Sequence, residues 1–407
     1  MSKLPEIKAD SIKRRKNKIK TFWLHLTIMI EINGGGIYMS REKSELLCIS
    51  GKFEVAGEPE NVVPHGNGHI NDTYLLTCRV APEKTCRYIL QRMNHEVFRD
   101  PKGLMENITG VTTFLQKEIA ERGGDPDREA LGVIMLKDGA SYSEEEDGTF
   151  WRMYRFVEGA DSYDAVEKPE DFYESAVAFG NFQKLLAKYP AKSLHETIPN
   201  FHNTVDRLEK FKKAVEADTM KRAAEVADEI RFVLDREDDC HVLCDMLVSG
   251  EIPLRVTHND TKLNNILLDH KTGKGICVID LDTVMPGSAL YDYGDSIRFG
   301  ANTGAEDEKD LSKISCDLEL FALYTKGFIE GCGGSLTQKE IKMLPMGAKM
   351  MTLECGMRFL TDYLEGDHYF KIHRPKHNLD RCRTQFCMVK DMEDKWEKMQ
   401  EIVEKYL

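Results

Sequence analysis

A polar stretch followed by two short apolar runs is the feature that most restricts what this chain can fold into. Asp260 and Asn265 stand five positions apart in the polar stretch. One apolar run, Ile266–Leu268, follows directly, and a second, Ile276–Ile279, ends at Asp280. Two such runs separated by polar and glycine residues predict a short β-ribbon. The ribbon would bring Asp280 opposite the loop that carries Asp260 and Asn265.

These residue types in this order are typical of kinase-type phosphoryl transfer. We expect Asp260 to orient the attacking hydroxyl and accept its proton. Asn265 and Asp280 would hold Mg²⁺ against the ATP phosphates, because a hard cation prefers oxygen ligands. Lys262 is expected near the transferred phosphoryl group, and Asp282 could replace or support Asp280. The alternative interpretation is a polar loop with solvated carboxylates.

The same segment resembles the aminoglycoside phosphotransferase superfamily of small-molecule kinases, and the likeness runs from about Lys43 to the C-terminus. The stretches that carry it are Thr257–Asn265, Ile279–Gly287, His65–Tyr74, Tyr88–Asn94 and Arg358–Leu364. Within the superfamily the likeness is greatest to the N-acetylhexosamine 1-kinases, which make a sugar 1-phosphate from ATP and the free sugar. The resemblance implies an α+β, two-lobed protein-kinase-like fold. Its β-rich, nucleotide-binding N-terminal lobe would cover residues 39–157, and a mainly helical catalytic lobe would cover 158–407.

Composition narrows the classes of partner. Hydrophobic residues make up 41% and charged residues 31% of the 407 residues, which is typical of a soluble globular protein. The net charge of −13 argues against nucleic acid, whose phosphates would be repelled. The 11 scattered cysteines favour a reduced, cytoplasmic protein over a disulfide-stapled one. We expect a small-molecule sugar substrate with ATP and Mg²⁺, and no membrane partner.

The first 38 residues differ in character from the rest. Residues 12–20 are basic and residues 21–32 are largely apolar, which resembles a signal peptide. The apolar stretch is too short for a membrane span of about 20 residues, and no A-x-A cleavage site follows it. We therefore expect that Met39 is the true start and that residues 1–38 are a mis-called leader. A peripheral amphipathic anchor and a disordered tail are the alternatives.

Candidate nucleotide contacts lie along the β-rich lobe. Gly66 and Gly68 suit a hairpin that covers phosphates with backbone N–H groups, although turns also need glycine. The next strand has no lysine where such kinases place one. It offers Gln91 and Arg92 instead, which would point to opposite faces of the strand. Alignment by the apolar residues Ile89 and Leu90 favours Gln91 for the lysine position, but it leaves open which of the two side chains touches the phosphates. By resemblance, Glu106 would be the helix glutamate that braces this strand, although an exposed glutamate is equally ordinary there.

The segment that crosses between the lobes is expected at the end of an apolar run. Arg155, Phe156 and Val157 occupy that position. In kinases of this type the adenine bonds to the backbone of the linker, so these three residues are candidates by position. After them, apolar residues recur at helical spacing, which favours a helical second lobe.

The resemblance also implies a sugar site. His69, Phe299, Arg358 and Tyr369 match the family's sugar contacts, and a hexosamine needs planar aromatic surface together with charged or amide groups. Each residue also has an ordinary structural interpretation, with Phe299 in a core and Tyr369 at the surface. Asp295 is a candidate brace of the catalytic loop.

Two alternatives to a sugar kinase remain from the sequence. One is a kinase for another small molecule on the same fold, such as an aminoglycoside, choline or homoserine. The other is a nucleotide-binding pseudokinase, which the missing strand lysine permits and the joint presence of Asp260, Asn265 and Asp280 opposes. The preferred N-acetylhexosamine and the oligomeric state stay open, and His258 is expected to fix loop geometry rather than transfer protons.

Overall fold

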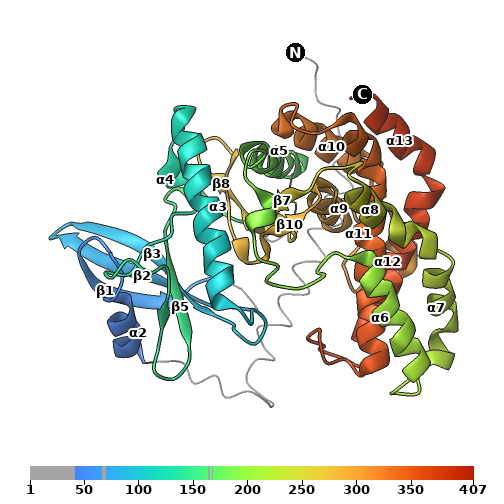
Figure 1. Cartoon of the computed structure of the whole chain (residues 1–407), viewed down its shortest axis with the longest axis horizontal. Coiled ribbons are helices and arrows are strands. Elements are labelled where there is room, and N and C mark those ends of the chain that lie inside the picture. The colour runs from blue at the N-terminus through green and yellow to red at the C-terminus, as the bar shows by residue number, and fades with distance from the viewer. Residues whose placement is uncertain (1–41, 67–69, 164–165, 167) are drawn as a thin grey trace. The chain divides into compact units, whose positions relative to one another are not determined.

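The computed structural model describes residues 42–66, 70–163, 166 and 168–407, and the proposed leader 1–38 lies outside them. The chain divides into two compact units, with the boundary after Ala160 (Figure 1). Unit 1 is built on an antiparallel sheet, and unit 2 is mainly helical. The predicted α+β fold, with a β-rich first part and a mainly helical second part, is confirmed.

Unit 1 contains a five-stranded sheet in the order β1-β2-β3-β5-β4. Its elements are α2 (Lys43–Ser50), β1 (Glu58–Pro64), β2 (Asp72–Ala81), β3 (Lys84–Met93), α3 (Pro101–Glu121), α4 (Pro126–Glu129), β4 (Ser143–Glu144) and β5 (Phe150–Arg155). The antiparallel pairing sets Gln91 of β3 between Thr73 of β2 and Arg152 of β5. Directly paired residues point to the same face, so these three side chains share one face of the sheet.

The opposite face of the sheet forms the core of unit 1. Leu76, Leu90 and Met153 are fully buried in one cluster, which Leu46 and Ile49 of α2 join. Side chains alternate between the faces of a strand, so the apolar face lies under α2 while the Gln91 face is separate. The alternation of side chains along β3 therefore gives one face of the sheet to the apolar core and leaves the other face to the polar side chains around Gln91.

A connection leads from the sheet to the long helix α3. Its first residue is Pro101, and the carboxylate of Asp100 accepts a hydrogen bond from the N–H of Gly103. Proline at the first helical position and an aspartate cap are the expected start of a helix. Leu104, Met105 and Ile108 are fully buried at the beginning of this helix.

Unit 2 packs helices around two short ribbons. Its helices are α5 (Pro169–Leu185), α6 (Thr204–Ala217), α7 (Ala227–Leu234), α8 (Glu237–Ser249), α9 (Ala289–Gly300), α10 (Leu318–Cys332), α11 (Gln338–Glu365), α12 (His377–Asp394) and α13 (Trp396–Glu404). Its strands are β7 (Arg255–Thr257), β8 (Ile266–Asp269), β9 (Gly275–Val278) and β10 (Met285–Gly287), while β6 (Ala160–Asp161) lies at the unit boundary. Short 3-10 turns lie between them at Ala191–Ser193, Ala223–Val226, Leu263–Asn265, Leu281–Thr283 and Leu311–Lys313.

The predicted ribbon is confirmed. Strands β8 and β9 pair antiparallel, with Ile266 opposite Val278. The N–H of Ile279 then bonds to the carbonyl of Asn265 at 2.9 Å, which continues the pairing to the residue before Asp280. The second ribbon pairs β7 with β10, so the stretches before and after the β8–β9 ribbon are also tied together.

Helices α9 and α11 approach closely beneath this region. A Cβ atom on Gly294 of α9 would lie only 2.2 Å from the carbonyl oxygen of Gly347 on α11. The start of α11 is fixed by a capping box, in which Thr337 and Glu340 each accept the other's backbone N–H. The close approach of two glycine backbones thus sets how far α11 stands from α9.

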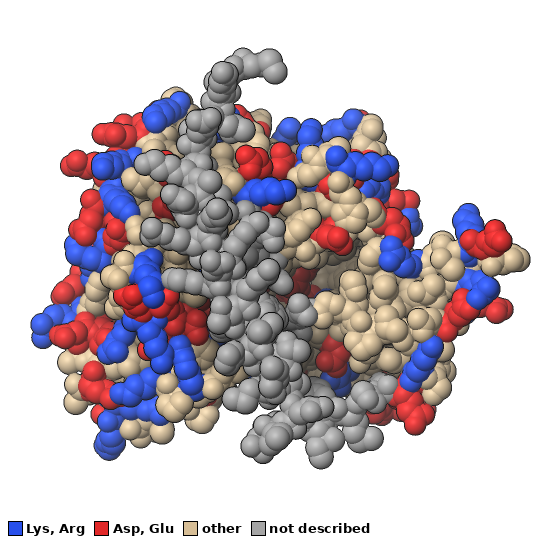
Figure 2. All heavy atoms as spheres, turned by 180° about the vertical axis from the view of Figure 1, so that it is seen from behind, with Lys and Arg blue, Asp and Glu red and all other residues tan. Residues whose placement is uncertain are grey.

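Charged side chains of both signs cover the visible face of unit 2, whereas the visible face of unit 1 carries fewer charges (Figure 2). In the part of the chain that the structure describes, no helix has both the length and the apolar composition that a membrane crossing requires.

The glycine contact between α9 and α11 yields a stability prediction. Gly294→Ala should lower the free energy of unfolding by about 1–3 kcal/mol, because the added methyl group overpacks the helix contact. Chemical denaturation followed by circular dichroism measures the change. Gly51→Ala is the matched control, since Gly51 has helical φ and a Cβ there would meet its nearest atom, the Cys48 carbonyl oxygen, at 3.4 Å. Equal stability of Gly294→Ala and wild type would show that the helices can separate freely.

Candidate active site

The candidate catalytic loop, which carries Asp260, is held in place by one buried carboxylate. Asp292 on α9 accepts hydrogen bonds from the backbone N–H groups of His258, at 3.1 Å, and Asn259, at 2.8 Å. It also accepts from Nε2 of Gln183 on α5 at 2.7 Å. Burial raises the pKa of the Asp292 carboxyl above its ordinary value, against the opposing effect of His258 and the N–H donors. The sequence interpretation missed this residue.

His258 links the catalytic loop to the ribbon. Its Nε2 lies 2.8 Å from the carbonyl oxygen of Ile279, and its Nδ1 lies 3.3 Å from the backbone nitrogen of Asp260. Nε2 must therefore carry the proton, since a carbonyl only accepts. The side chain is fully buried against Phe179 and Phe182. This contact locks the position of Asp280, the residue after Ile279, to that of Asp260.

A second carboxylate supports the other end of the loop, as Asp295 was expected to do. Its Oδ2 accepts from the N–H of Thr261 at 3.1 Å, and its Oδ1 accepts from Nε of Arg298 at 2.9 Å. Ser296 adds a bond from its hydroxyl to the carbonyl of Thr261. Asp292 and Asp295, less than one turn apart on α9, therefore hold the loop on either side of Asp260.

The proposed base and its neighbours lie within hydrogen-bond distance. Lys262 Nζ stands 2.8 Å from Asp260 Oδ1. Nδ2 of Asn265 donates to the Asp260 carbonyl at 2.7 Å and lies 3.2 Å from Oδ2. Burial opposes ionisation of Asp260, but Lys262 and His258 together hold the pKa of its carboxyl below the ordinary value. The carboxylate is therefore ionised at neutral pH, which is the form that a general base requires.

Asp280 and Asp282, the other proposed metal ligands, follow strand β9. Asp280 is exposed and adopts a left-handed backbone with φ 60°, immediately before the 3-10 turn Leu281–Thr283. Asp282 in that turn is buried. Nδ2 of Asn265 donates to the loop, and its amide oxygen is the atom that could bind a cation. An amide oxygen and carboxylates fit Mg²⁺, which completes its shell with phosphate oxygens and water.

The Gln91 face of unit 1 contains a cation that the sequence interpretation missed. Arg152, which is 1% exposed, donates from Nε and Nη2 to Oε1 of Gln91 at 3.0 and 2.9 Å. Nε2 of Gln91 in turn donates a hydrogen bond to Oγ1 of Thr73 at 2.9 Å. Arg92, on the other face, bonds to Asp72. A guanidinium on β5 thus lies beside the β3 position where a lysine was expected.

The hairpin between β1 and β2 bears one of the two candidate glycines. Gly66 has φ 73°, which favours glycine, and a Cβ there would meet no neighbour within 4 Å. It borders a hollow of about 180 Å³ with Pro64, His65, Asn71 and Thr73 among its lining residues. Gly68 and His69 lie outside the described residues.

The remaining candidates of unit 1 lie on α3 and in the linker. Glu106 is exposed and its Oε1 lies 3.8 Å from Lys102 Nζ, whereas its neighbour Asn107 is 2% exposed. Arg155 pairs with Asp127. The Phe156 ring packs under Arg87, Val157 is buried, and the N–H groups of residues 155 and 156 bond within the unit. Of the linker side chains, only that of Arg155 is exposed.

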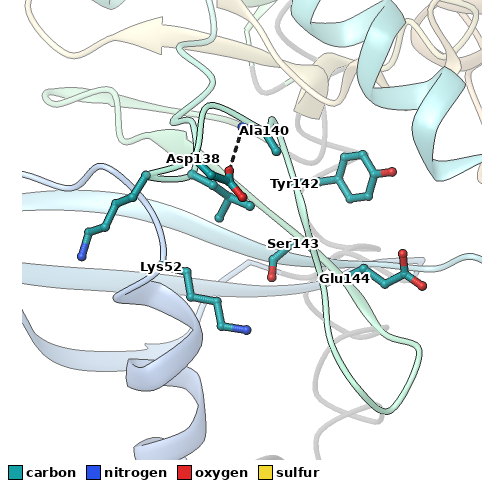
Figure 3. Close-up of a pocket in the computed structure, with 8 residues that line it drawn as sticks. Lys52, Asp138, Ala140, Tyr142, Ser143 and Glu144 are labelled. Atoms are coloured by element: carbon teal, nitrogen blue, oxygen red, sulfur yellow. Dashed lines mark hydrogen bonds between the residues drawn. The ribbon is translucent and has the colours of Figure 1, made fainter.

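A larger hollow in unit 1, of about 460 Å³, includes none of the candidate residues (Figure 3). The charged side chains beside it are engaged locally. Lys52 pairs with Glu145, and Asp138 accepts the N–H of Ala140 at 3.0 Å, the dashed line in the figure. This hollow is formed by turns at the edge of the sheet.

Two of the residues assigned to the sugar by resemblance meet in unit 2. The Arg358 guanidinium lies 5.7 Å from the centre of the Tyr369 ring, and its Nη2 is 3.4 Å from the Tyr369 hydroxyl. The Phe370 and Phe201 rings stand at 5.5 and 5.3 Å from the same guanidinium. Tyr369 is 64% exposed, and Phe299 on α9 is 37% exposed. An arginine among three aromatic rings, with one ring open to solvent, can bind a polar ring-shaped ligand.

A buried carboxylate stands behind Arg358. Glu354, one helical turn earlier on α11, lies 3.0 Å from Nδ1 of His202, 3.8 Å from Arg358 and 4.0 Å from Arg207. Nε2 of His202 is 3.3 Å from the carbonyl oxygen of Asn259 in the catalytic loop. Burial opposes the charge on His202, yet Glu354 raises the pKa of its imidazole above the ordinary value. Arg358 is thus connected to the catalytic loop through two side chains.

Comparison with known proteins agrees with this geometry. A profile of the phosphotransferase enzyme family matches residues 61–313, more than half of the chain. The fold is similar to that of an aminoglycoside phosphotransferase from Alicyclobacillus acidocaldarius subsp. acidocaldarius DSM 446 (TM-score 0.59, 13% identity, 93% of this chain and 99% of that one). It is also similar to a microcompartment-associated aminopropanol kinase (TM-score 0.55, 16% identity, 88% and 98%) and to an amicoumacin kinase in complex with AMP-PNP, Ca²⁺ and Ami (TM-score 0.56, 14% identity, 87% and 94%). At these identities the solved structures support the fold alone.

The geometry around Asp260 predicts the effect of removing the base. Asp260→Asn should lower kcat by about 10²–10⁴, the usual range for a general base, with little change in the KM for ATP. Steady-state kinetics measure both. Asp161→Asn is a control for loss of a carboxylate, because Asp161 is exposed and pairs with exposed His270. Near-wild-type turnover in Asp260→Asn would remove this residue from the reaction.

The His202–Glu354 pair predicts a pH-dependent stability. Because the folded pKa of His202 is raised, its stabilising contribution is complete below the unfolded value of about 6.5 and is lost as pH rises through the folded pKa. Wild type should exceed His202→Gln by roughly 1.5–3 kcal/mol at pH 5.5, as for a hydrogen bond to a charged group.

Urea unfolding at pH 5.5, 7 and 8.5 measures this difference, which should shrink across the series. In a Glu354→Gln background, His202→Gln should produce no such trend. A wild-type advantage that grows with pH would mean that His202 is neutral in the folded protein.

Proposed function

The chain belongs to the phosphotransferase enzyme family, and from that premise we propose that it transfers the γ-phosphoryl group of Mg·ATP to the anomeric hydroxyl of an N-acetylhexosamine. The observation that carries the sugar assignment is the position of Arg358 among Phe201, Tyr369 and Phe370. The resemblance of the sequence to sugar 1-kinases is the reason for choosing the anomeric hydroxyl as the attacking group.

The residues of unit 2 would divide the reaction between them. The acceptor oxygen forms a bond to the γ-phosphorus as the bond to the β-phosphate bridging oxygen breaks, and Asp260 takes the hydroxyl proton. Lys262, 2.8 Å from that carboxylate, would place positive charge beside the transferred group. Asn265 and Asp280 would hold Mg²⁺, with Asp282 in support, and the ion when bound neutralises charge on the phosphate oxygens. Most of the catalysis then comes from positioning and electrostatics.

The nucleotide half of the proposal rests on unit 1. Gly66 and Gly68 would cover the phosphates, and Val157 with its neighbours in the linker would bind adenine through the backbone. Arg152, held by Gln91 through two hydrogen bonds, would supply a cation on the face where the strand lysine is missing. The missing lysine is therefore a weaker argument for a pseudokinase than it was from the sequence.

The charge behind Arg358 argues against cationic acceptors. One carboxylate, Glu354, is surrounded by Arg358, Arg207 and His202. The pKa of His202 is raised, as described above, so the cluster carries an excess of positive charge. A choline or aminoglycoside acceptor beside Arg358 would meet like charge, which is unfavourable in a partly buried site. A neutral sugar can instead accept hydrogen bonds from the guanidinium and stack on Tyr369.

We place this reaction in the cytoplasm, because ATP is available there and because the cysteines that the structure describes are free thiols. Its acceptor is a free small molecule rather than a polymer or a lipid. An acceptor panel that contains both N-acetylglucosamine and N-acetylgalactosamine decides between the two sugars.

An acceptor panel tests the proposed function. Transfer from γ-labelled ATP should occur with N-acetylglucosamine or N-acetylgalactosamine and should be absent with their methyl glycosides, which keep every other hydroxyl but block the anomeric oxygen. The product should lose its reducing end and release phosphate in mild acid, as a sugar 1-phosphate does. Choline, homoserine, aminopropanol and an aminoglycoside complete the panel. Labelling of a methyl glycoside at a comparable rate would overturn the 1-kinase assignment, and labelling of only a cationic acceptor would overturn the sugar assignment.

Arg358 provides the variant for the acceptor side. Arg358→Ala should lower kcat/KM for the sugar by about 10–100-fold, equivalent to roughly 1–3 kcal/mol for a lost charge-assisted hydrogen bond. The KM for ATP should hardly change. Arg383→Ala is the matched control, because Arg383 pairs with Glu229 on the outside of the same unit. If both variants keep wild-type kcat/KM for the sugar, Arg358 does not bind the acceptor.

A further inference from the structure

Three acidic or basic side chains form one stripe along α11. Glu354, Arg358 and Asp362 follow one another at intervals of four residues, which places them on the same face of a helix. Glu354 connects through His202 to the catalytic loop, and Arg358 faces the aromatic rings. The third residue, Asp362, has no role in the proposed reaction so far, and it is 4% exposed.

The carboxylate of Asp362 holds the turn that follows α11. Its Oδ1 accepts from the backbone N–H groups of His368, at 2.9 Å, and Tyr369, at 2.7 Å. Its Oδ2 accepts from the N–H of Phe370 at 2.9 Å and from Nδ2 of Asn378 at 2.8 Å. Three successive backbone donors therefore converge on one side chain. Hydrogen bonds to an ionised acceptor are the stronger class.

This arrangement requires a sharp change of direction after the helix. Gly366 and Asp367 both have positive φ, at 116° and 61°, and their N–H groups bond to the carbonyl of Asp362. Asp367 bonds to Arg222 and Asn378, which fastens the base of the turn. The side chain of Asp362 closes the other end, where Tyr369 and Phe370 leave the turn.

The position of the two aromatic rings follows from that closure. Tyr369 is 64% exposed, so packing of its ring contributes little to holding it in place. Its backbone N–H makes the shortest of the bonds to the Asp362 carboxylate, and its hydroxyl lies 3.4 Å from Nη2 of Arg358, one helical turn before Asp362. Phe370, the next residue, contacts both Arg358 and Phe359.

We propose that Asp362 is a positioning residue for the acceptor, which holds Tyr369 and Phe370 beside Arg358 by binding three consecutive backbone N–H groups. The inference rests on the proposed function, because it takes Arg358 and Tyr369 as the acceptor contacts. Asp362 touches neither the acceptor nor the reacting atoms. Its contribution should therefore appear in acceptor binding and should vanish when the Tyr369 ring is absent.

An asparagine at position 362 removes the charge and one hydrogen-bond acceptor while it keeps the shape of the side chain. Asp362→Asn keeps the volume but replaces one acceptor oxygen by an NH₂ group, which would face an N–H donor of the turn. The KM for the acceptor should rise about tenfold, the size of effect common for coupled neighbours, while kcat and the KM for ATP stay within about twofold. Asp394→Asn is the control for loss of a carboxylate, since Asp394 is exposed and pairs with Lys390.

A double-mutant cycle distinguishes positioning from a general structural role. In a Tyr369→Ala background, Asp362→Asn should change the acceptor KM by less than about twofold, because the two residues act as one unit. Equal increases in both backgrounds, or no increase in wild type, would overturn the proposal. If Asp362→Asn does not fold, Asn378→Ala, which removes one donor to the same carboxylate, takes its place in the cycle with the same expectation.

A second measurement does not depend on which acceptor is used. Amide hydrogen exchange at His368, Tyr369 and Phe370 should be slow in wild type and clearly faster in Asp362→Asn, with no change at residues of α9. Identical exchange rates in the two proteins would contradict the proposed role of Asp362 in holding these three N–H groups. Should the panel identify an acceptor other than a hexosamine, the proposed function fails while the cycle, run with that acceptor, still tests Asp362.

Discussion

The buried carboxylate of Asp292 is the interaction on which the catalytic side of unit 2 depends. It accepts the N–H groups of two consecutive loop residues, His258 and Asn259, and a third bond from Gln183. Asn259 has φ 64°, a conformation that local contacts must hold in place. A loop that carried unsatisfied N–H groups into the interior would be unstable. The carboxylate thus makes the loop conformation that presents Asp260 the stable one.

The geometry of helices extends this constraint to the acceptor side. Asp292 and Asp295 on α9 are less than one turn apart and hold neighbouring parts of the loop, while the Gly294–Gly347 approach brings α9 against α11. Along α11, Glu354, Arg358 and Asp362 then follow one another at intervals of about 6 Å, the rise of four helical residues. In this arrangement the proposed base Asp260, the Arg358 guanidinium and the turn that carries Tyr369 and Phe370 share one support. Chemistry that relies on positioning needs such a support, because little covalent assistance is involved.

Local patterns in the sequence predicted the parts of the site that depend on neighbours along the chain. The β8–β9 ribbon follows from two apolar runs separated by polar and glycine residues, and Asp295 was a candidate brace of the loop that it does contact. Contacts between distant segments were missed. His202 and Glu354 are 152 positions apart, and Gln91 and Arg152 are 61 apart. No periodicity links such pairs, since tertiary packing alone brings them together. On α3, Glu106 was chosen by resemblance, whereas the helix phase buries Asn107.

The proposed role of Asp260 as the base requires that buried contacts fix the conformation of its loop. The kcat of Asp292→Asn at saturating ATP and acceptor tests this claim directly. The substitution keeps the volume of the side chain but replaces one acceptor oxygen by an NH₂ donor. The account predicts a fall of about 10²-fold, as for a misplacement near 1 Å, in a protein that circular dichroism shows to be folded and that still binds nucleotide. A folded Asp292→Asn protein with kcat within twofold of wild type would contradict it.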